Sequence, residues 1–347
     1  MEFLAEYGMF LAKAVTVLVV VALIIGLAAS AGVKDKPSGL KITKLNDKLN
    51  KLKSQLQESV LDKTALKSVK KAEKTAAKQQ AKAEKNADKK ESTTSKKKVF
   101  VLDFNGDIKA SQGERLKNEI SALLTIASPE DEVVVKVESG GGMVHQYGLA
   151  SSQLDRIKSH NIPLTVCVDK VAASGGYMMA VVADKIVAAP FAILGSIGVV
   201  AQVPNFNKLL KKNDIEFEVH TAGEYKRTLT LFGENTDKAR EKFQEDLKDV
   251  HELFKTFVSE HRPVVDVNTV ANGDIWYGQR ALDVKLIDEI KTSDQYLQDK
   301  CKDCDVFLIT TPKKKALGQR LGLAAQTAIS RGVEQAVEKL SFQKWYM

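Results

Sequence analysis

Two glycine-rich turns carry the residue types best suited to chemistry. The first, SGGG at 139–142, follows the apolar run VVVKVE, and the second, ASGG at 173–176, follows CVDKVA. Each turn precedes a segment with a helical pattern. In parallel α/β sheets such turns lie at the carboxyl edge of the strands, where ligands bind. Glycines there leave backbone N–H groups open to an approaching oxygen, as the oxyanion of acyl transfer requires.

Ser174 begins the second predicted helix, near the positive end of the helix dipole. A Ser-Gly-Gly turn is also an ordinary cap, so this motif alone does not establish a nucleophile. A lysine with a pKa of ~10.4 accepts a serine proton near neutral pH only if burial lowers that pKa. Lys226 is, on spacing alone, one lysine among many. His145 and His220 are alternative bases, although no matching carboxylate is evident.

The elements that must position these turns alternate along the chain. Apolar runs predict strands over 99–104, 133–137, 163–168 and 185–189. Helical spacing predicts helices over 116–124, 144–157, 177–182 and 243–257. Near-continuous apolar strands between amphipathic helices indicate an α/β fold with a parallel sheet covered on both faces. Hydrophobic residues make up 44% of the chain, enough for such a core.

The amino-terminal region predicts a single-pass membrane anchor. Residues 14–33 carry no charge and match the ~20 residues that cross a ~30 Å hydrocarbon layer. Residues 29–31 have the Ala-x-Ala form of a signal-peptide cleavage site, but the segment before the span is not strongly basic, which favours an uncleaved anchor. Lysines close behind the span favour a cytosolic location for the rest of the chain by the positive-inside rule.

The net charge of +8 arises largely from a lysine-rich tract before residue 99. Beside a hydrophobic span, such a tract is expected to meet lipid headgroups rather than nucleic acid.

Four leucines at 4-3-4 spacing (Leu45, Leu49, Leu52 and Leu56) predict a short amphipathic helix or coiled-coil seam. The composition of residues 62–98 predicts a solvated helical spacer. Residues 316–340 again have a helical pattern. Cys301 and Cys304 form a lone CxxC with too few ligands for zinc, either free or bridged locally.

Four segments, in this order, resemble the signature motifs of the signal-peptide-peptidase-A family of membrane serine peptidases: VESGGGM, VAASGGYMMA, LGSIGVV and AGEYKR. The resemblance covers roughly residues 99–293. It implies a ClpP/crotonase-like fold of repeated β-β-α units, a homo-oligomer and a bacterial inner-membrane location. The resulting divisions are an anchor (1–33), a spacer (34–98), a catalytic domain (99–293) and a helical extension (294–347). The family's association with the outer face conflicts with the charge bias, so the face stays open.

By the same resemblance, Ser174 matches the nucleophile and Lys226 the general base of a Ser/Lys dyad. Ser196 matches a serine that orients the lysine. The N–H groups of Gly142 and Gly175 match the oxyanion donors.

Gly141 is the alternative for the first of these donors. Gly140 replaces the usual proline in this turn, which loosens it.

The expected activity is endopeptidase cleavage of signal-peptide fragments or of misfolded or membrane peptides, without a metal or cofactor. Two other functions stay open. A crotonase-like acyl-thioester enzyme shares the oxyanion site but needs no Ser/Lys pair. A non-catalytic membrane scaffold uses the glycine turns only structurally.

Overall fold

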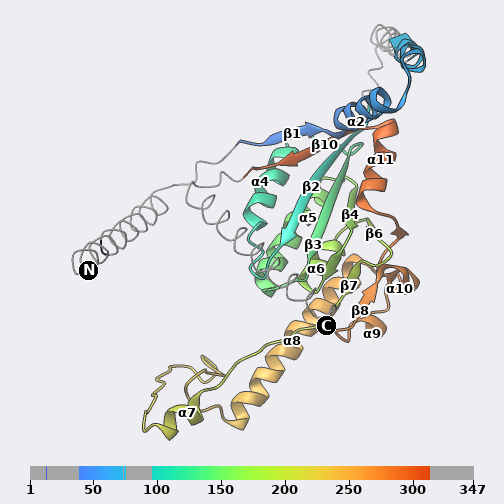
Figure 1. Ribbon diagram of the computed structural model, residues 1–347. Coiled ribbons are helices and arrows are strands. Elements are labelled where there is room, and N and C mark those ends of the chain that lie inside the picture. The colour runs from blue at the N-terminus through green and yellow to red at the C-terminus, as the bar shows by residue number, and fades with distance from the viewer. Residues whose placement is uncertain (1–12, 14–38, 73, 76–95, 313–347) are drawn as a thin grey trace, which may run out of the picture. The chain divides into compact units, whose positions relative to one another are not determined.

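The computed structural model describes residues 13, 39–72, 74, 75 and 96–312 (Figure 1). Residues Lys41–Thr310 form one compact α/β unit. The predicted anchor over 14–33, residues 76–95 of the lysine-rich tract and the predicted helix over 316–340 lie outside the described residues. Among the helices that are described, none is long and apolar enough to cross a membrane.

The described residues include ten strands that join in one sheet: β1 (Lys41–Lys44), β2 (Lys98–Gly106), β3 (Glu132–Ser139), β4 (Leu164–Val168), β5 (Val171–Ala173), β6 (Lys185–Ala188), β7 (Ile193–Gly195), β8 (Ile275–Tyr277), β9 (Glu289–Ile290) and β10 (Asp305–Thr310). The main row runs β1-β10-β2-β3-β4-β6-β9, and a branch leaves the end of β3 through β5 and β7 to β8. Among the strand pairs of the described residues, only the outer pairs β1–β10 and β7–β8 are antiparallel. The predicted parallel sheet is therefore confirmed for its central strands.

The helices follow or separate these strands (Figure 1): α2 (Leu45–Val60), α4 (Gly113–Leu123), α5 (Val144–Ser159), α6 (Gly175–Ala180), α7 (Asn207–Lys212), α8 (Asp237–His261), α9 (Val267–Val270), α10 (Gly278–Asp283) and α11 (Ser293–Asp303). The strands β4 and β5 with α6 form a β-β-α unit whose two strands lie in different parts of the sheet. The next two strands are divided in the same way, because β6 lies in the main row of the sheet and β7 lies in the branch.

Alternate residues of the central strands are buried on opposite faces of the sheet. On one face, β2 places Phe100, Leu102 and Phe104 against the apolar sides of α4 and α5. On the other face, Val99 and Val101 belong to a smaller cluster with residues of α11. Burial on both faces explains why these strands read as continuous apolar runs.

The compact unit extends beyond the predicted catalytic boundaries of 99–293 at both ends. Residues 305–310 form a strand rather than part of a helical extension, because Val306 and Ile309 are buried on opposite sheet faces while β10 pairs with β2. The Asn46 side chain at the start of α2 fixes this end. It donates to the carbonyls of Cys301 (3.1 Å) and Cys304 (2.9 Å) and accepts from Val306 N–H (2.8 Å).

The helix α8 contacts the core with only part of its length. Its buried residues, Phe254 and Val258, lie in its carboxy-terminal half. Residues 200–236, here called the arm, precede α8 and contain α7. Figure 1 shows α7 at the end of α8 that points away from β7 and β8. The aromatic rings of Phe206 and Phe217 lie 6.0 and 5.4 Å from that of Phe232, which gives the arm a small apolar cluster of its own.

Candidate active site

Three parallel strand ends bring the two glycine turns together. Ser139, the last residue of β3, is paired with Ala172 of β5, and Ala173 is paired with Gly195 of β7. Ser174 and Ser196 are the residues that follow these paired positions. The prediction that both turns lie at the carboxyl edge of the sheet is therefore confirmed, and Ser196 lies beside them.

Ser174 lies at the junction of β5 and α6 in a backbone conformation that is rare for an L-residue, with φ 52° and ψ −120°. Its N–H donates to Gly195 O (2.8 Å), and its carbonyl accepts from Met178 N–H in α6 (2.9 Å). The surrounding strand and helix thus enforce a conformation that costs of order 1–3 kcal/mol. Ser196 occupies the matching place after β7, with φ 49° and its N–H on Asp274 O (2.7 Å).

Gly141 brings the first turn into contact with the nucleophile turn. It has φ 89°, and a Cβ at this position would lie 2.7 Å from Gly175 N and 2.8 Å from Ser174 Cβ. A Cβ on Gly175 would in turn collide with the ring of Tyr147. Glycine is therefore required at both positions, because any side chain would force the two turns apart.

The backbone N–H groups of these turns differ in whether they have acceptors. Gly141 N–H donates to Ser139 Oγ (3.0 Å), so in this conformation it is excluded as an oxyanion donor. Within the described residues, neither Gly142 N–H nor Gly175 N–H has an acceptor. Gly175 is the first residue of α6, where an N–H has no intrahelical partner. Gly142 and Gly175 therefore remain the two candidate donors.

A buried polar cluster lies beneath the first turn. Ser139 Oγ lies 2.5 Å from the hydroxyl of Tyr147, which donates to the carbonyl of Asp107 (2.7 Å). Ser139 is 2% exposed and Tyr147 is 0% exposed. Burial raises the pKa of Tyr147, so this hydroxyl keeps its proton.

The sequence reasoning missed Tyr147. The available signal was a tyrosine in line with the apolar positions Ala150 and Leu154, because a buried tyrosine needs a partner for its hydroxyl.

Lys226 lies in the arm, exposed, away from this cluster of turns. Its neighbour Glu224 is paired with Lys238 (2.6 Å), in the first turn of α8. Further along α8, His251 contacts Ile197 O (3.2 Å), next to Ser196. These two points on α8 are about 20 Å apart along the helix axis at ~1.5 Å per residue.

The structure therefore does not bring Lys226 to Ser174 within one protomer. Among the described residues, neither the Lys226 amine nor the Ser174 hydroxyl has a hydrogen-bond partner. Among the described residues no hydrogen bond joins either histidine to Ser174: His145 is exposed on α5, and His220 pairs with Glu218 (3.0 Å) on the exposed arm.

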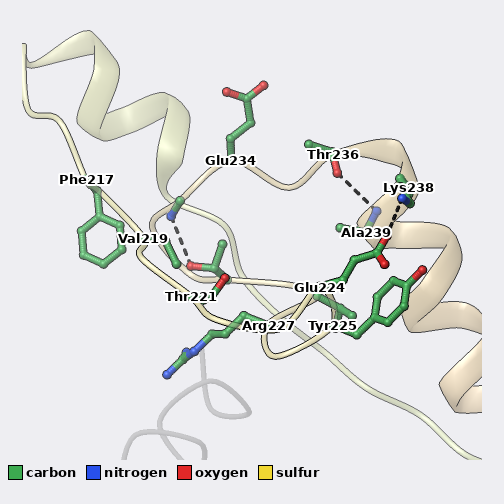
Figure 2. A pocket seen from close by; sticks show the side chains of 13 residues that line it. Phe217, Val219, Thr221, Glu224, Tyr225, Arg227, Glu234, Thr236, Lys238 and Ala239 are labelled. Carbon is green, nitrogen blue, oxygen red and sulfur yellow. Dashed lines mark hydrogen bonds and ion pairs between the residues drawn. The ribbon is translucent and has the colours of Figure 1, made fainter.

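A pocket of about 350 Å³ lies in the arm beside Lys226. Figure 2 shows it between the 217–227 segment and the start of α8, closed on one side by the Glu224–Lys238 pair. Tyr225 and Arg227, the residues on either side of Lys226, both line it. Neither Lys226 nor a residue of the glycine turns is among the residues that line it.

The cysteines supply no reactive thiol near this site. Cys167 is buried in β4, and burial raises its pKa to about 12. Cys301 and Cys304 are free thiols, and burial raises the pKa of Cys301. Thiols with raised pKa values are poor nucleophiles near neutral pH, because the thiolate is the reactive form.

Comparisons with known proteins agree with the motifs. The chain matches the model of the Peptidase family S49 N-terminal region over residues 2–154 and that of Peptidase family S49 over residues 156–306. It is 48% identical to the "Probable protease SohB" of Haemophilus influenzae over 94% of both chains. It is 51% identical to that of Buchnera aphidicola subsp. Acyrthosiphon pisum over 73% of this chain and 74% of the relative.

A solved structure, a mutant of the membrane-bound stomatin-specific protease 1510-N, is similar over 59% of this chain and 85% of its own, with 14% identity and a TM-score of 0.40. The family assignment depends on the sequence matches, which span both glycine turns, Ser196 and Lys226. The chain belongs to peptidase family S49, the family of the SohB proteases.

Proposed function

We propose that this peptidase is a serine endopeptidase in which Ser174 attacks the scissile carbonyl and Lys226 of a neighbouring copy acts as general base. The observation that carries the proposal is the geometry of Ser174. The residue is enforced at a rare backbone conformation, in contact with Gly141, beside two backbone N–H groups that have no acceptor among the described residues. This combination supplies a nucleophile and an oxyanion site at one sheet edge.

A neighbouring copy is the proposed source of Lys226 because the arm has an unburied apolar surface. Its exposed large side chains are Val200, Val203, Phe206, Leu209, Ile215, Phe217, Val219, Tyr225, Leu231 and Phe232. Exposed apolar groups gathered on one segment are typical of a protein–protein interface. Docking the arm on a second copy would remove water from Lys226, which a lysine base requires.

In the proposed mechanism, the Ser174 hydroxyl attacks the peptide carbonyl while its proton passes to Lys226 Nζ. The N–H groups of Gly142 and Gly175 hold the negative oxygen of the tetrahedral intermediate. The C–N bond then breaks, and the leaving amine takes the proton from Lys226. Water then attacks the ester on Ser174 while its proton passes to Lys226 Nζ, and the return of that proton to the serine oxygen as the ester bond breaks restores both side chains. Ser196 would orient the lysine.

The proposed setting is a single-pass anchor over 14–33 in the bacterial inner membrane, with lipid headgroups near the lysine-rich tract. Substrates would be signal-peptide fragments or misfolded or membrane peptides. We also propose that the chain has a ClpP/crotonase-like fold. The support is the β-β-α unit of β4, β5 and α6 and its partial repeat in β6 and β7.

Labelling with a fluorophosphonate probe tests the proposal on the full-length chain in membranes. The wild-type chain should be labelled, Ser174→Ala should not, and Lys226→Ala should lose at least about tenfold in rate because general bases contribute of order 10²–10⁴. Lys208→Ala is the matched control, since this lysine is also exposed on the arm. Full labelling of Ser174→Ala would overturn the proposal. Comparing whole cells with spheroplasts assigns the membrane face.

A further inference from the structure

We propose that Tyr147 is a positioning residue for this reaction: acting through Ser139, it holds the first glycine turn where Gly142 N–H serves Ser174. The inference rests on the proposed function and adds two residues to its machinery. Neither touches the reacting atoms, so each acts through the glycine turns.

The single hydroxyl protons of Tyr147 and Ser139 fix the direction of the hydrogen bonds in this buried cluster. Tyr147 has one hydroxyl proton, which it donates to Asp107 O (2.7 Å), so it must accept at its contact with Ser139 (2.5 Å). Ser139 then donates its single proton to Tyr147 and accepts from Gly141 N–H (3.0 Å). The result is one directional chain from Gly141 to Asp107, in which each bond polarises the next.

The same tyrosine contacts the nucleophile turn. Its ring packs against Gly175 so closely that a Cβ there would collide with it. One buried side chain therefore touches Gly175 with its ring and, through Ser139, the turn that contains Gly142.

The Asp107 end of this chain of hydrogen bonds is also held in place. The Asp107 carboxylate accepts from Ser111 N–H (2.8 Å) and Lys109 N–H (3.1 Å), which fixes the loop that supplies the acceptor carbonyl. The next residue, Ile108, accepts from Met143 N–H (2.8 Å) directly after Gly142. The first turn is thus held at both ends, by Ser139 and by the 107–111 loop.

Loss of the Tyr147 hydroxyl would leave Ser139 without its acceptor and Gly141 N–H without an oriented partner. The turn could then shift by a fraction of an ångström while the ring still supports Gly175. An oxyanion donor acts on the transition state, so kcat should fall while KM stays unchanged. The expected loss is about tenfold, smaller than the 10²–10³ that follows deletion of a donor.

The test compares Tyr147→Phe, Ser139→Ala and the double variant in the full-length protein, by the rate of fluorophosphonate labelling and by kcat and KM for peptide cleavage. Tyr177→Phe is the matched control, because Tyr177 is also fully buried and donates to one backbone carbonyl, that of Leu286 (3.0 Å). Thermal unfolding of every variant measures the structural cost separately.

Both single variants should be about tenfold slower than the wild type, the double variant should be no slower than either, and Tyr177→Phe should match the wild type. Additive losses, or an equal loss in Tyr177→Phe, would overturn it, as would a wild-type rate in Tyr147→Phe. If the wild-type chain is not labelled at Ser174, the proposed function fails instead, so the two failures are distinguishable.

Discussion

Gly140 and Gly141 are neighbours in one turn but have different surroundings. A Cβ on Gly140 would meet nothing within 4 Å, whereas a Cβ on Gly141 would meet Ser174 Cβ at 2.8 Å. Gly141 also has a positive φ of 89°. Of these two neighbours, only Gly141 is therefore required by the contact between the turns.

Gly141→Ala should abolish fluorophosphonate labelling and lower the free energy of unfolding by about 1–3 kcal/mol, because the added methyl group forces the two turns apart in a backbone region that alanine avoids. Gly140→Ala is the control and should keep wild-type labelling. Labelling rates and thermal unfolding of the two variants check this. Equal behaviour of the two would contradict the close contact between the turns.

The glycine turns were readable from the sequence because strand, turn and helix patterns follow one another at 133–157 and 163–182. Tyr147 was not, because its acceptor is the carbonyl of Asp107, a backbone atom 40 positions away. The same holds for the engaged N–H of Gly141, since no residue pattern distinguishes it from that of Gly142.

At the scale of elements, α11 is joined to the sheet by a buried carboxylate. Glu132 at the start of β3 accepts from Tyr296 (2.6 Å) and Thr165 (2.9 Å) and pairs with Lys300. Burial acts to raise the pKa of Glu132, but the bonds from Lys300, Tyr296 and Thr165 outweigh it and hold the pKa below its usual range. Glu132 therefore stabilises the fold in its charged form.

Because the folded-state pKa of Glu132 is lowered, its contribution is present above the unfolded value of ~4.3 and is lost as pH falls through the folded pKa. Glu132→Gln should cost about 2 kcal/mol at neutral pH, and the difference from the wild type should shrink below pH ~4. Thermal unfolding across pH checks this, with the exposed Glu130→Gln as control. A difference that does not depend on pH would contradict the ion pair.

The strands β2, β3, β4 and β6 and the longer helices were predictable because burial on one or both faces sets their periodicity, whereas β10 was assigned to the helical extension. The strands β5, β7, β8 and β9 were not predicted, since two or three residues are too short to show any period. Yet β5 and β7 are the strands that bring Ser196 beside Ser174. The placement of Ser196 beside Ser174 therefore depends on two strands that are too short to predict from the sequence.

At the scale of the whole molecule, a single protomer lacks a base at Ser174 among its described residues. Lys226 lies in the arm near the Glu224–Lys238 pair, which is about 20 Å along α8 from the contact of His251 beside Ser196. The sequence could not reveal this separation, because the order of motifs along the chain does not give the distance between them in the fold.

Mixing Ser174→Ala with Lys226→Ala chains should restore labelling to about a quarter of the wild-type amount, since each site of a head-to-tail ring takes one residue from each of two copies. The label should appear on the Lys226→Ala chain, which keeps Ser174. Gel separation of differently tagged chains measures this, and the Lys226→Ala chain alone is the control. An unlabelled mixture in chains that co-purify would place the dyad inside one copy.

The pairing of β1 with β10 has a consequence for the lysine-rich segment. Because β1 and β2 belong to the same sheet, residues 45–97 are the connection between two of its strands. Only residues 34–40 connect the end of the predicted anchor to the first strand. The lysine-rich segment therefore connects two strands of the sheet and does not connect the predicted anchor to the sheet. Insertions or deletions within it would leave the length of the anchor connection unchanged.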